Sequence, residues 1–562
     1  MKKLYLLIII LFFTGSTFSQ IVYEDINNTA IYEFLDELAN NRIIELNSMV
    51  KPYSREYISR KLREAQLIID NGQLIIKGKQ KKFKVSKRLK KELMFYLQDY
   101  QLEGRVMPVT YEHKVGFVAR NNTKMKVALN PLAFNYKDSL FTFSLRPILG
   151  VQWMTNENAA EYHRWWGGSM FGYIGKNFGF YANIRDNEES TPMAKPEYFI
   201  LAQGEVYKNM ENGAVNYSEM RGGIIASVGW GSIGIMNDRV AWGDNYHGAN
   251  ILSGKAPAFP YLQLHLNPAK WFDFNYMHGW LNSNIIDSSR SYYIDGVFRQ
   301  TIRDKYIAAN MFTFIPWRGL NLTFGNSIIY SDITVNPLYL IPFLFYNAVE
   351  GTRSNYMYNA GSNTQLFFNI SSRQINHLHL FISLFIDEWK TSRVTDPNTS
   401  NFTSLKAGLR LSDFPVQNVV LTAEYTRTQP MTYDHYIATT TFASNDYVLG
   451  HYMRENSQEI YVAIDWRPLR GLLINGSFTL AQHGDDVKYR YDGGYAVDGI
   501  LFLQNKTWQN SAYALSARYE FVNNGYFFLQ YLNGEQQGDI KFNPDFMRGK
   551  TNTFMCGVNL GF

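Results

Sequence analysis

The sequence predicts a transmembrane antiparallel β-barrel of about 18 strands with a small N-terminal α-helical periplasmic domain. The first observation is that the last ten residues alternate between two faces of a strand, with one apolar face: Phe554, Cys556, Val558, Leu560 and Phe562. The second is a regular succession of tight turns and long polar loops. The third is the composition, with 39 Tyr, 39 Phe and 11 Trp although the mean hydropathy is −0.25. A barrel with aromatic girdles and a polar lumen fits this composition.

The final strand requires a closed sheet. In lipid an unpaired strand edge costs several kcal/mol per backbone group, so a strand there needs partners on both sides. The C-terminal aromatic residue, Phe562, resembles the end of the closing strand in bacterial outer-membrane barrels, where it is an assembly signal. We therefore expect a monomer whose partners include outer-membrane lipid and the barrel-assembly machinery.

Residues 1–19 have the layout of a secretory signal peptide. Met1-Lys2-Lys3 precedes the apolar run Leu4 to Phe13, and the small-residue site Thr17-Phe18-Ser19 stands before Gln20. After Gln20 we find no apolar run of the roughly 20 residues that a transmembrane helix needs. These features leave periplasm, outer membrane or secretion, and the strand pattern favours the outer membrane. The sole cysteine is Cys556, so neither disulfides nor a cysteine metal site can hold the fold.

Residues 20–105 predict a helical domain in the periplasm. Ile31, Phe34, Leu35 and Leu38 follow helical spacing, while Ser54 and Ser86 are candidate N-caps of two further helices. A basic run without acidic residues lies between and within these last two helices: Lys77, Lys79, Lys81, Lys82, Lys84, Lys87, Arg88, Lys90 and Lys91. It predicts either a solvated helix face and loop, or contact with acidic polysaccharide or membrane head groups.

Residues 139–562 predict the outer-membrane β-barrel. Tight turns are expected at 175–177, 267–270, 316–319, 371–374, 413–417, 467–470 and 522–524. Long loops are expected at 187–215, 240–258, 282–303, 430–456 and 484–509. In outer-membrane barrels the short turns face the periplasm and the long loops face outward. Residues 106–138 are a connecting segment or an extra hairpin, so about 16 or 20 strands also remain possible.

The barrel interior is predicted from alternation along the strands. A charge on the lipid face costs roughly 2 to 4 kcal/mol near the midplane, so the following charges must point inward: Lys406, Arg410, Glu424, Asp465, Arg518 and Glu520. Their mixed signs favour internal ion pairs and a filled barrel over an open channel.

One loop, residues 336–346, is too apolar to lie in water, and its two prolines oppose a continued strand. We expect it to fold into the barrel mouth and constrict the pore through Leu340, Pro342, Phe343 and Phe345.

Four short motifs in this architecture resemble the Wzi family of capsule-assembly outer-membrane lectins. In the helical part they are Ile31 to Leu38 and Lys51 to Arg55; in the barrel they are Asn237 to Gly243, continuing at Ile251 to Pro257, and Leu449 to Tyr452. The resemblance covers nearly the whole mature chain in architecture. It implies a helical bundle that caps the periplasmic side of the barrel, and a protein that binds capsular polysaccharide or exopolysaccharide at the cell surface without catalysis.

Sugar binding needs flat apolar faces for pyranose rings, surrounded by amide, carboxylate or guanidinium groups for the hydroxyls. Two aromatic and polar segments in predicted outer parts of the barrel offer this mixture, and they supply the candidate polysaccharide-binding residues: Trp242, Asp244, Asn245, Tyr246, Trp165 and Trp166. The alternative interpretation places the three tryptophans in the outer aromatic girdle.

Other function classes lack support in the sequence. No nucleophile elbow, metalloprotease helix or phosphate loop is present, so we expect no catalytic residues and no cofactor. His377 and His379 without a third ligand do not predict a metal site. The net charge of +6 is too small on this length to indicate nucleic acid. The remaining alternative is a porin or a gated transport channel.

Overall fold

The computed structural model describes residues 20–71, 73–76, 79–82, 85–103, 125–129, 132–209, 213–353, 361–396, 399–486, 491–492, 495–496 and 500–561. The predicted signal peptide, residues 1–19, lies outside the described residues. None of the described helices is long and apolar enough to cross a membrane.

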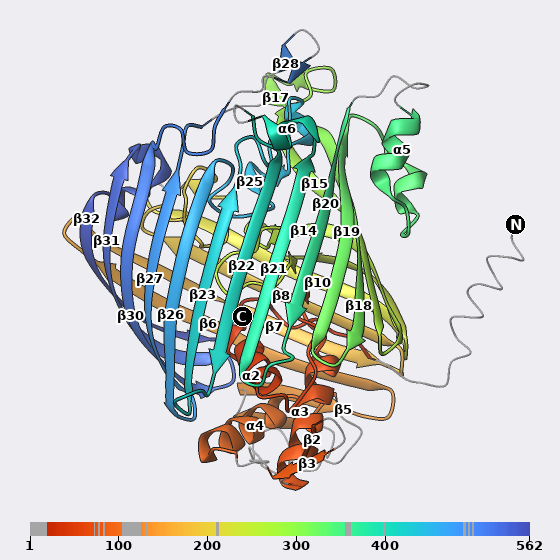
Figure 1. Ribbon diagram of the computed structural model, residues 1–562, viewed down its shortest axis with the longest axis vertical. Helices are drawn as coiled ribbons and strands as arrows, with labels where there is room; N and C mark the ends of the chain where they lie inside the picture. The colour runs from red at the N-terminus through yellow and green to blue at the C-terminus, as the bar shows by residue number, and fades with distance from the viewer. Residues whose placement is uncertain are drawn as a thin grey trace, which may run out of the picture.

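The molecule is a closed antiparallel barrel of 18 strands (Figure 1), as the sequence predicts. The strands of the ring, in chain order, are β6 (Phe141–Thr155), β7 (Ala160–Ile174), β8 (Phe178–Glu189), β10 (Val215–Val228), β11 (Gly231–Asp238), β14 (Phe259–Ala269), β15 (Phe272–Ile286), β18 (Ile302–Trp317), β19 (Leu320–Ser331), β20 (Ser362–Ser372), β21 (Leu378–Glu388), β22 (Phe402–Ser412), β23 (Val419–Thr428), β26 (Ser457–Leu469), β27 (Leu472–His483), β30 (Trp508–Val522), β31 (Gly525–Gly538) and β32 (Lys550–Leu560). The last strand closes the ring on the first, with Cys556 opposite Trp153 and Leu560 opposite Leu149.

The two ends of the barrel differ. Short turns join the strands at one end, which we call the turn end, and most long connections leave from the other, the loop end. The segment before β6 forms the hairpin β4 (Met125–Leu129) and β5 (Leu132–Lys137). β5 pairs with the start of β6, Phe134 opposite Leu145. In the described part of residues 106–138 the structure has this one hairpin, and it adds no strand to the ring.

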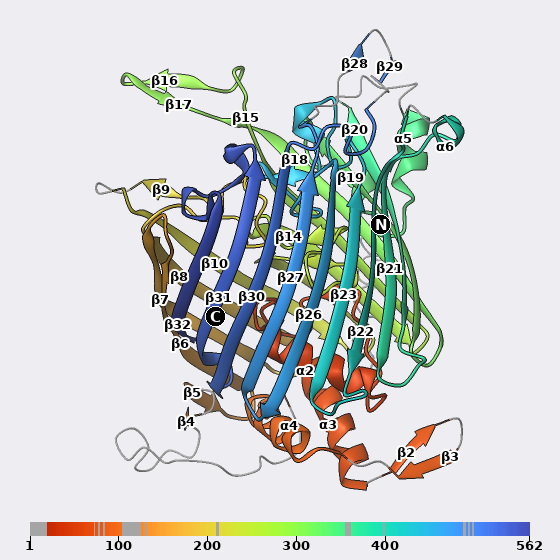
Figure 2. The same cartoon turned by 60° about the vertical axis from the view of Figure 1, so that its left-hand side comes forward.

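The N-terminal region, residues 20–103, lies at the turn end. It contains α2 (Thr29–Asn40), β1 (Val50–Lys51), α3 (Arg55–Asn71), β2 (Gln73–Ile76), β3 (Lys79–Lys82) and α4 (Lys87–Asp99). Both predicted caps form: Ser54 Oγ accepts from the Tyr57 N–H at 3.1 Å, and Ser86 Oγ from the Leu89 N–H at 3.0 Å. The apolar faces of α3 and α4 share one core with α2. Figures 1 and 2 place α2 against the turn end of the barrel and α3 and α4 beyond it.

The connection 239–258, expected as an outer loop, instead runs into the lumen. Its strand β12 (Ala241–Trp242) pairs with β13 (Leu252–Ser253) on one side and with β1 on the other, which forms a three-stranded inner sheet. This pairing joins the N-terminal region to the middle of the barrel, because Lys51 stands opposite Ala241 and Val50 opposite Trp242. Polar backbone groups inside a lumen need partners, and the inner sheet supplies them.

The remaining connections carry short elements: β9 (Lys208–Asn209), β16 (Tyr292–Ile294), β17 (Val297–Arg299), η1 (Pro337–Leu340), α5 (Tyr346–Arg353), α6 (Ser392–Thr395), η2 (Ala438–Thr440), β24 (Ala443–Ser444), β25 (Tyr447–Val448), β28 (Tyr491–Asp492), β29 (Tyr495–Ala496), η3 (Ile540–Phe542) and η4 (Asp545–Met547). The β16–β17 hairpin projects beyond the barrel rim (Figure 2). The 429–456 connection turns inward, since Tyr433, Phe442 and Leu449 belong to the core of the lumen.

The loop expected to constrict the pore does not enter it. Residues 336–346, which include Leu340, Pro342, Phe343 and Phe345, pack against the outer face of β15, β18 and β19, and α5 lies outside the barrel wall in Figure 1. The constriction prediction is therefore wrong. An apolar loop can leave water by covering either face of a barrel wall, and this one covers the outside.

The predicted inward charges are confirmed. Lys406 Nζ lies 2.7 Å from Glu424 Oε2, and Arg410 Nη2 lies 3.3 Å from Asp465 Oδ2. Glu520 and Arg518 contact the N-terminal region instead of each other: Tyr96 donates to Glu520 at 2.9 Å, and Arg518 lies 3.7 Å from Glu33.

Candidate functional site

The inward-facing side chains of the barrel wall divide into two groups. Along β18 to β23 nearly all of them are buried, for example Ile307, Met311 and Phe385. Along β27, β30 and β31 most are partly exposed, for example Asn475 and Gln530. We call these stretches the packed half and the open half. The difference means that the lumen is filled on one side and hollow on the other.

The inner sheet and its connection fill the packed half. The Trp242 ring meets Phe367 of β20 edge-on, 6.1 Å between centroids, and Asp244 accepts hydrogen bonds from Ser48 and from Asn369. Asn250 donates to the carbonyls of Ser383 at 3.2 Å and Ser404 at 3.0 Å. These contacts replace water along the wall.

The open half encloses a cavity of about 450 Å³, within the size range of small-ligand pockets. Its aromatic lining comprises Trp165, Tyr246, Tyr461, Tyr526 and Phe528. Its polar lining includes Glu33, Gln152, Arg410, Asp465, Asn475, Arg518 and Gln530. Aromatic faces surrounded by amides, carboxylates and guanidinium groups are the combination that sugars require.

The polar groups on one side of this cavity are held in place. The Arg410 guanidinium lies 4.4 Å from the Tyr246 ring centroid, and Asn475 Nδ2 donates to Asp465 Oδ1 at 2.7 Å. On the other side, Trp165 Nε1 donates to Asn559 Oδ1 at 3.2 Å. Trp165 is 7% exposed, so only the part of its ring that borders the cavity is available to a ligand.

Beneath the cavity, α2 is fixed by arginines from the turn end. Arg373 Nη2 donates to Asp36 Oδ1 at 2.6 Å, and Arg467 Nη1 to Glu37 Oε2 at 3.2 Å. Burial alone would raise the pKa of Asp36, but Arg373 and Arg410 outweigh it and hold this pKa well below its usual range. The pKa of Glu37 is likewise lowered, because Arg88 and Arg467 outweigh its burial.

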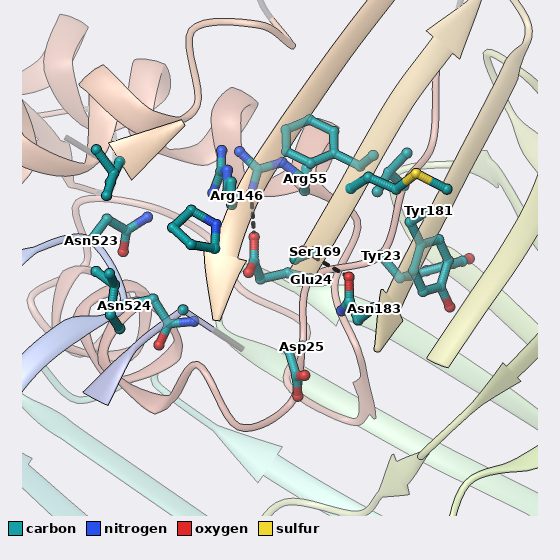
Figure 3. Close-up of a pocket in the computed structure, with 17 residues that line it drawn as sticks. Tyr23, Glu24, Asp25, Arg55, Arg146, Ser169, Tyr181, Asn183, Asn523 and Asn524 are labelled. Carbon is teal, nitrogen blue, oxygen red and sulfur yellow. Dashed lines mark hydrogen bonds and ion pairs between the residues drawn. The ribbon is translucent and has the colours of Figure 1, made fainter. Parts of the chain in front are cut away.

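The N-terminal region also contacts the seam where the ring closes. Arg146 of β6 donates to Asp99 Oδ1 at 2.6 Å, and Asn523 donates to the same carboxylate. Arg55 donates to Glu24 at 2.6 Å (Figure 3). The pocket between these groups measures about 50 Å³, so residues 22–25 and Arg55 lie close against the barrel wall at this place.

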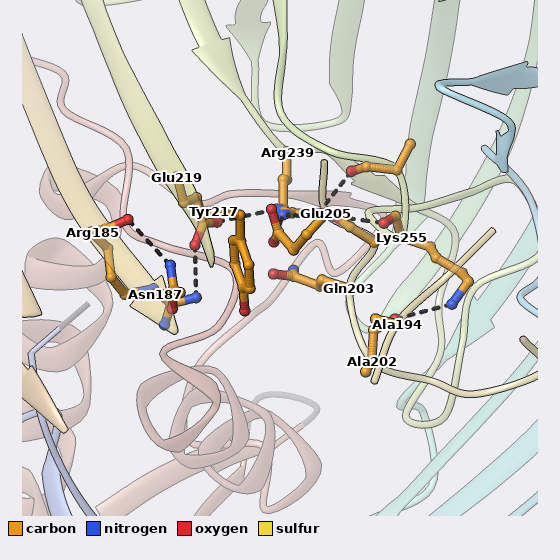
Figure 4. A network of polar contacts seen from close by, with 12 residues as sticks. Arg185, Asn187, Ala194, Ala202, Gln203, Glu205, Tyr217, Glu219, Arg239 and Lys255 are labelled. Atoms are coloured by element: carbon orange, nitrogen blue, oxygen red, sulfur yellow. Dashed lines mark hydrogen bonds and ion pairs between the residues drawn. The ribbon is translucent and has the colours of Figure 1, made fainter. Parts of the chain in front are cut away.

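At the loop end, a polar network ties another connection to the wall (Figure 4). Arg239 is buried and contacts Glu205 and Glu219, while Lys255 Nζ donates to the carbonyls of Ile200 and Ala202 at 2.7 and 3.0 Å. Burial, with Arg239 nearby, lowers the pKa of Lys255 to about 7. The network fixes the described part of the preceding connection, residues 190–209, to both ends of the inward-running connection 239–258.

The structure separates the predicted polysaccharide-binding residues. Trp165 and Tyr246 line the cavity, and the Tyr246 hydroxyl donates to Asp36 Oδ2 at 2.9 Å. Trp242 and Asp244 are buried against the packed half. The prediction that they lie in an exposed outer loop is therefore wrong. Asn245 is half-buried beside them and donates to the Gly243 carbonyl at 2.9 Å. Trp166 is 45% exposed on the outer face, the position that the girdle interpretation gives it.

Several cavity residues were not singled out as site residues from the sequence: Gln152, Tyr461, Asn475, Tyr526, Phe528 and Gln530. Strand alternation gives the inward direction of each. It does not reveal which part of the wall stays uncovered, because that depends on where the inner sheet packs.

Among the described residues, no group of three or more His, Cys, Asp or Glu side chains is arranged to hold a metal ion. His377 lies in the turn before β21, 2.9 Å from the Ser412 carbonyl. His379 is buried inside the wall, 2.9 Å from Ser371 Oγ. Each histidine has its own hydrogen-bond partner.

The sequence matches no protein-family model and no curated protein. Among solved structures, the fold is that of outer-membrane β-barrels. The structure of Wzi from Escherichia coli, an outer-membrane protein involved in group 1 capsule assembly and described as a carbohydrate-binding β-barrel, is similar with a TM-score of 0.55 and 11% identity. The match covers 97% of this chain and 100% of that one. The chain therefore has a Wzi-like fold.

Two outer-membrane proteins match with lower scores. Acinetobacter baumannii OccAB2 has a TM-score of 0.42 and 9% identity over 75% of this chain and 99% of that one. Pseudomonas aeruginosa OccD3 has a TM-score of 0.39 and 10% identity over 74% and 90%. Both scores are below 0.5.

Proposed function

We propose that this chain is a non-catalytic outer-membrane protein that binds capsular polysaccharide or exopolysaccharide and assists its assembly or attachment at the cell surface. The observation that carries the proposal is the open half of the lumen. It is a cavity of about 450 Å³ with the aromatic and polar lining that pyranose rings require. The likeness to Wzi, whose solved structure is described as a carbohydrate-binding β-barrel, supports this proposal.

The proposed orientation follows from the two ends. The turn end and the N-terminal region face the periplasm, since short turns are periplasmic in barrels of this class, and the loop end faces outward. Residues 1–19 direct export, and the barrel-assembly machinery reads the C-terminal strand. The barrel acts as a monomer surrounded by outer-membrane lipid.

Within the cavity, Trp165 and Tyr461 supply stacking surfaces, and Arg410, Asp465 and Asn475 supply hydrogen-bond partners for hydroxyl groups. Tyr246 closes the inner side, held by Asp36. Trp242, Asp244 and Asn245 support the site indirectly, because they keep the inner sheet and its connection in place.

The test is co-sedimentation of the protein, reconstituted in proteoliposomes, with the host's own capsular polysaccharide or exopolysaccharide. The structure offers a matched pair of variants on adjacent residues. Trp165→Ala removes a stacking face worth about 0.5 to 1.5 kcal/mol, so we expect binding to fall roughly 2- to 10-fold. Trp166→Ala changes the outer face and should leave binding unchanged.

Equal loss in both variants, or binding unaffected by Trp165→Ala, would contradict the cavity as the binding site. Absence of any polysaccharide binding by the unaltered protein, together with steady passage of small solutes, would favour the alternative function of a porin or gated channel.

A further inference from the structure

Residues 336–346, which we call the outer-wall segment, lie on the outer face of the barrel wall. In outer-membrane barrels this face is an apolar band in contact with lipid. They leave β19 at the loop end and descend along the outside of the wall. Phe343 stacks on Phe274 near the start of β15, with 4.6 Å between ring centroids. Since β15 starts at the turn end, the segment covers much of the barrel's height.

The wall beneath this segment departs from the rule for lipid-facing strands. Asn310 of β18 and Asn326 of β19 stand opposite each other in mid-strand and point outward. The inward positions beside them are Ile307, Met311 and Ile329, which belong to the core of the lumen. An amide without a hydrogen bond is costly in hydrocarbon. The outward side chains of Asn310 and Asn326 therefore need hydrogen-bond partners from the protein.

The outer-wall segment is that partner. Asn310 Nδ2 donates to the carbonyls of Pro342 at 2.9 Å and Leu344 at 2.8 Å. Asn326 Oδ1 accepts from the Tyr346 N–H at 2.9 Å, and the Tyr276 hydroxyl donates to the Tyr339 carbonyl at 2.7 Å. The wall therefore satisfies backbone groups that an irregular segment would otherwise expose.

The segment's own sequence reduces the number of backbone groups that still need a hydrogen-bond partner. Pro337 and Pro342 have no backbone N–H to satisfy. Asn336 Oδ1 accepts from the Leu338 N–H at 3.1 Å, and its carbonyl accepts from the Tyr339 N–H at 3.0 Å. Irregular backbone is tolerated at membrane depth only when protein groups satisfy it, and these contacts provide that condition.

The exposed side chains of the segment are apolar. Leu340 is 39% exposed, Ile341 45%, Phe343 57% and Phe345 49%. Residues 337–346 contain no charged residue. The neighbouring outward residues Leu322 and Phe324 are also apolar and exposed, so the segment continues the apolar surface of the barrel.

We infer that the outer-wall segment is a re-entrant segment lying in the lipid phase, where Leu340, Ile341, Phe343 and Phe345 contact the acyl chains of the surrounding membrane. This inference rests on the proposed outer-membrane location and is independent of polysaccharide binding. The segment has two faces of opposite chemistry: backbone groups bind the polar stripe of the wall, and side chains face lipid.

The test uses spin labels in reconstituted bilayers, with collision rates measured for molecular oxygen, which partitions into lipid, and for a water-soluble nickel chelate. The native thiol of Cys556, which is exposed on the outward face of β32, reports barrel insertion. In a Cys556→Ser background, labels are placed at Phe343→Cys and, as an aqueous control, at Tyr293→Cys. Tyr293 is 73% exposed on the projecting hairpin.

We expect the labels at 556 and 343 to share a high oxygen and low nickel accessibility, with the ratio reversed at 293. A nickel-accessible label at 343 beside a lipid-exposed label at 556 would overturn the inference while leaving the membrane location intact. Shielding of 343 from both reagents would mean that a protein covers the segment, and would also overturn it. Nickel access at both 556 and 343 would contradict the outer-membrane location itself.

Two asparagine variants test the anchoring. Asn310→Ala removes the donor to two carbonyls of the segment, so we expect the label at 343 to become more mobile. Asn533→Ala, at an outward position on β31 where the side chain bonds Asn552 at 2.8 Å, should leave this label unchanged. Unchanged mobility in Asn310→Ala would contradict the proposed anchoring.

Discussion

The packed half and the open half of the barrel wall share one strand pattern but differ in what lies against them. Both alternate outward and inward residues along each strand, and most of the outward residues are apolar. In the packed half, Ser383 and Lys406 are fully buried under the inner sheet and its connection, whereas Ser516 and Gln530 in the open half line a cavity. The wall sequence thus makes the barrel, and the inward-folded connection decides where the barrel is hollow.

The largest expected effect comes from breaking the support of the packed half. Arg373→Ala removes a buried guanidinium that contacts Asp36, Asn40 and Ser48. The buried carboxylate of Asp36 then loses one of its cationic partners, which should lower the free energy of unfolding by about 3 to 5 kcal/mol. The matched change in the open half, Asn475→Ala, should cost less than about 1 kcal/mol, because water reaches Asp465 through the cavity.

These values are measured by denaturant unfolding of both variants in the same detergent or lipid. Similar losses in Arg373→Ala and Asn475→Ala would remove the energetic distinction between the two halves.

A pair of enlarging substitutions sharpens the comparison. Ser383→Phe overfills a fully buried site and should destabilise the barrel by about 1 to 3 kcal/mol. Ser516→Phe projects into the cavity and should leave stability nearly unchanged while reducing polysaccharide binding. Heat-induced loss of the folded band in electrophoresis reports stability, and co-sedimentation reports binding. A destabilised Ser516→Phe variant that binds normally would mean that the cavity is not free space.

A smaller effect is expected from acid. The pKa values of Asp36 and Glu37 are lowered in the folded protein, so their contribution is complete above their unfolded values of about 4. It is lost as the pH falls from there toward the lowered values, because the carboxylates become protonated. The protection factor of the α2 amides, which is their exchange rate relative to the intrinsic rate at the same pH, should therefore be constant above about pH 5 and fall below about pH 4.

Arg373→Met provides the control for this pH dependence. By removing one of the cations that lower the pKa of Asp36, it should make the protection of α2 fall less below about pH 4 than in the unaltered protein. A protection factor that is independent of pH in the unaltered protein would contradict the role of these ion pairs in docking α2.

Much of the barrel could be predicted from sequence because the deciding physics is local. Period-2 alternation and the cost of charge in lipid predicted the closing strand and the inward positions of Lys406 and Asp465. The hydrogen-bonding preference of serine predicted the caps at Ser54 and Ser86. None of these predictions requires knowledge of a distant partner.

The destinations of the long connections could not be predicted in this way. Trp242 was expected outside and lies inside, while Phe343 was expected inside and lies outside. Apolar side chains leave water equally well on either face of the wall, so hydrophobicity does not choose between them. The deciding partners are on other strands: β1 pairs with β12, and Asn310 binds the Pro342 carbonyl. For Phe343, the sequence did contain a signal: Asn310 and Asn326 occupy outward positions in mid-strand, where a polar side chain needs a protein partner on the outside of the barrel.

The most direct measurement is single-channel conductance of the purified protein in a planar bilayer, with and without the host's polysaccharide. A turn end covered by the N-terminal region and a lumen hollow on one side only predict a barrel without steady conductance that retains polysaccharide in a parallel co-sedimentation assay. Steady conductance that small solutes block, without polysaccharide binding, would contradict a closed binding barrel and identify a channel.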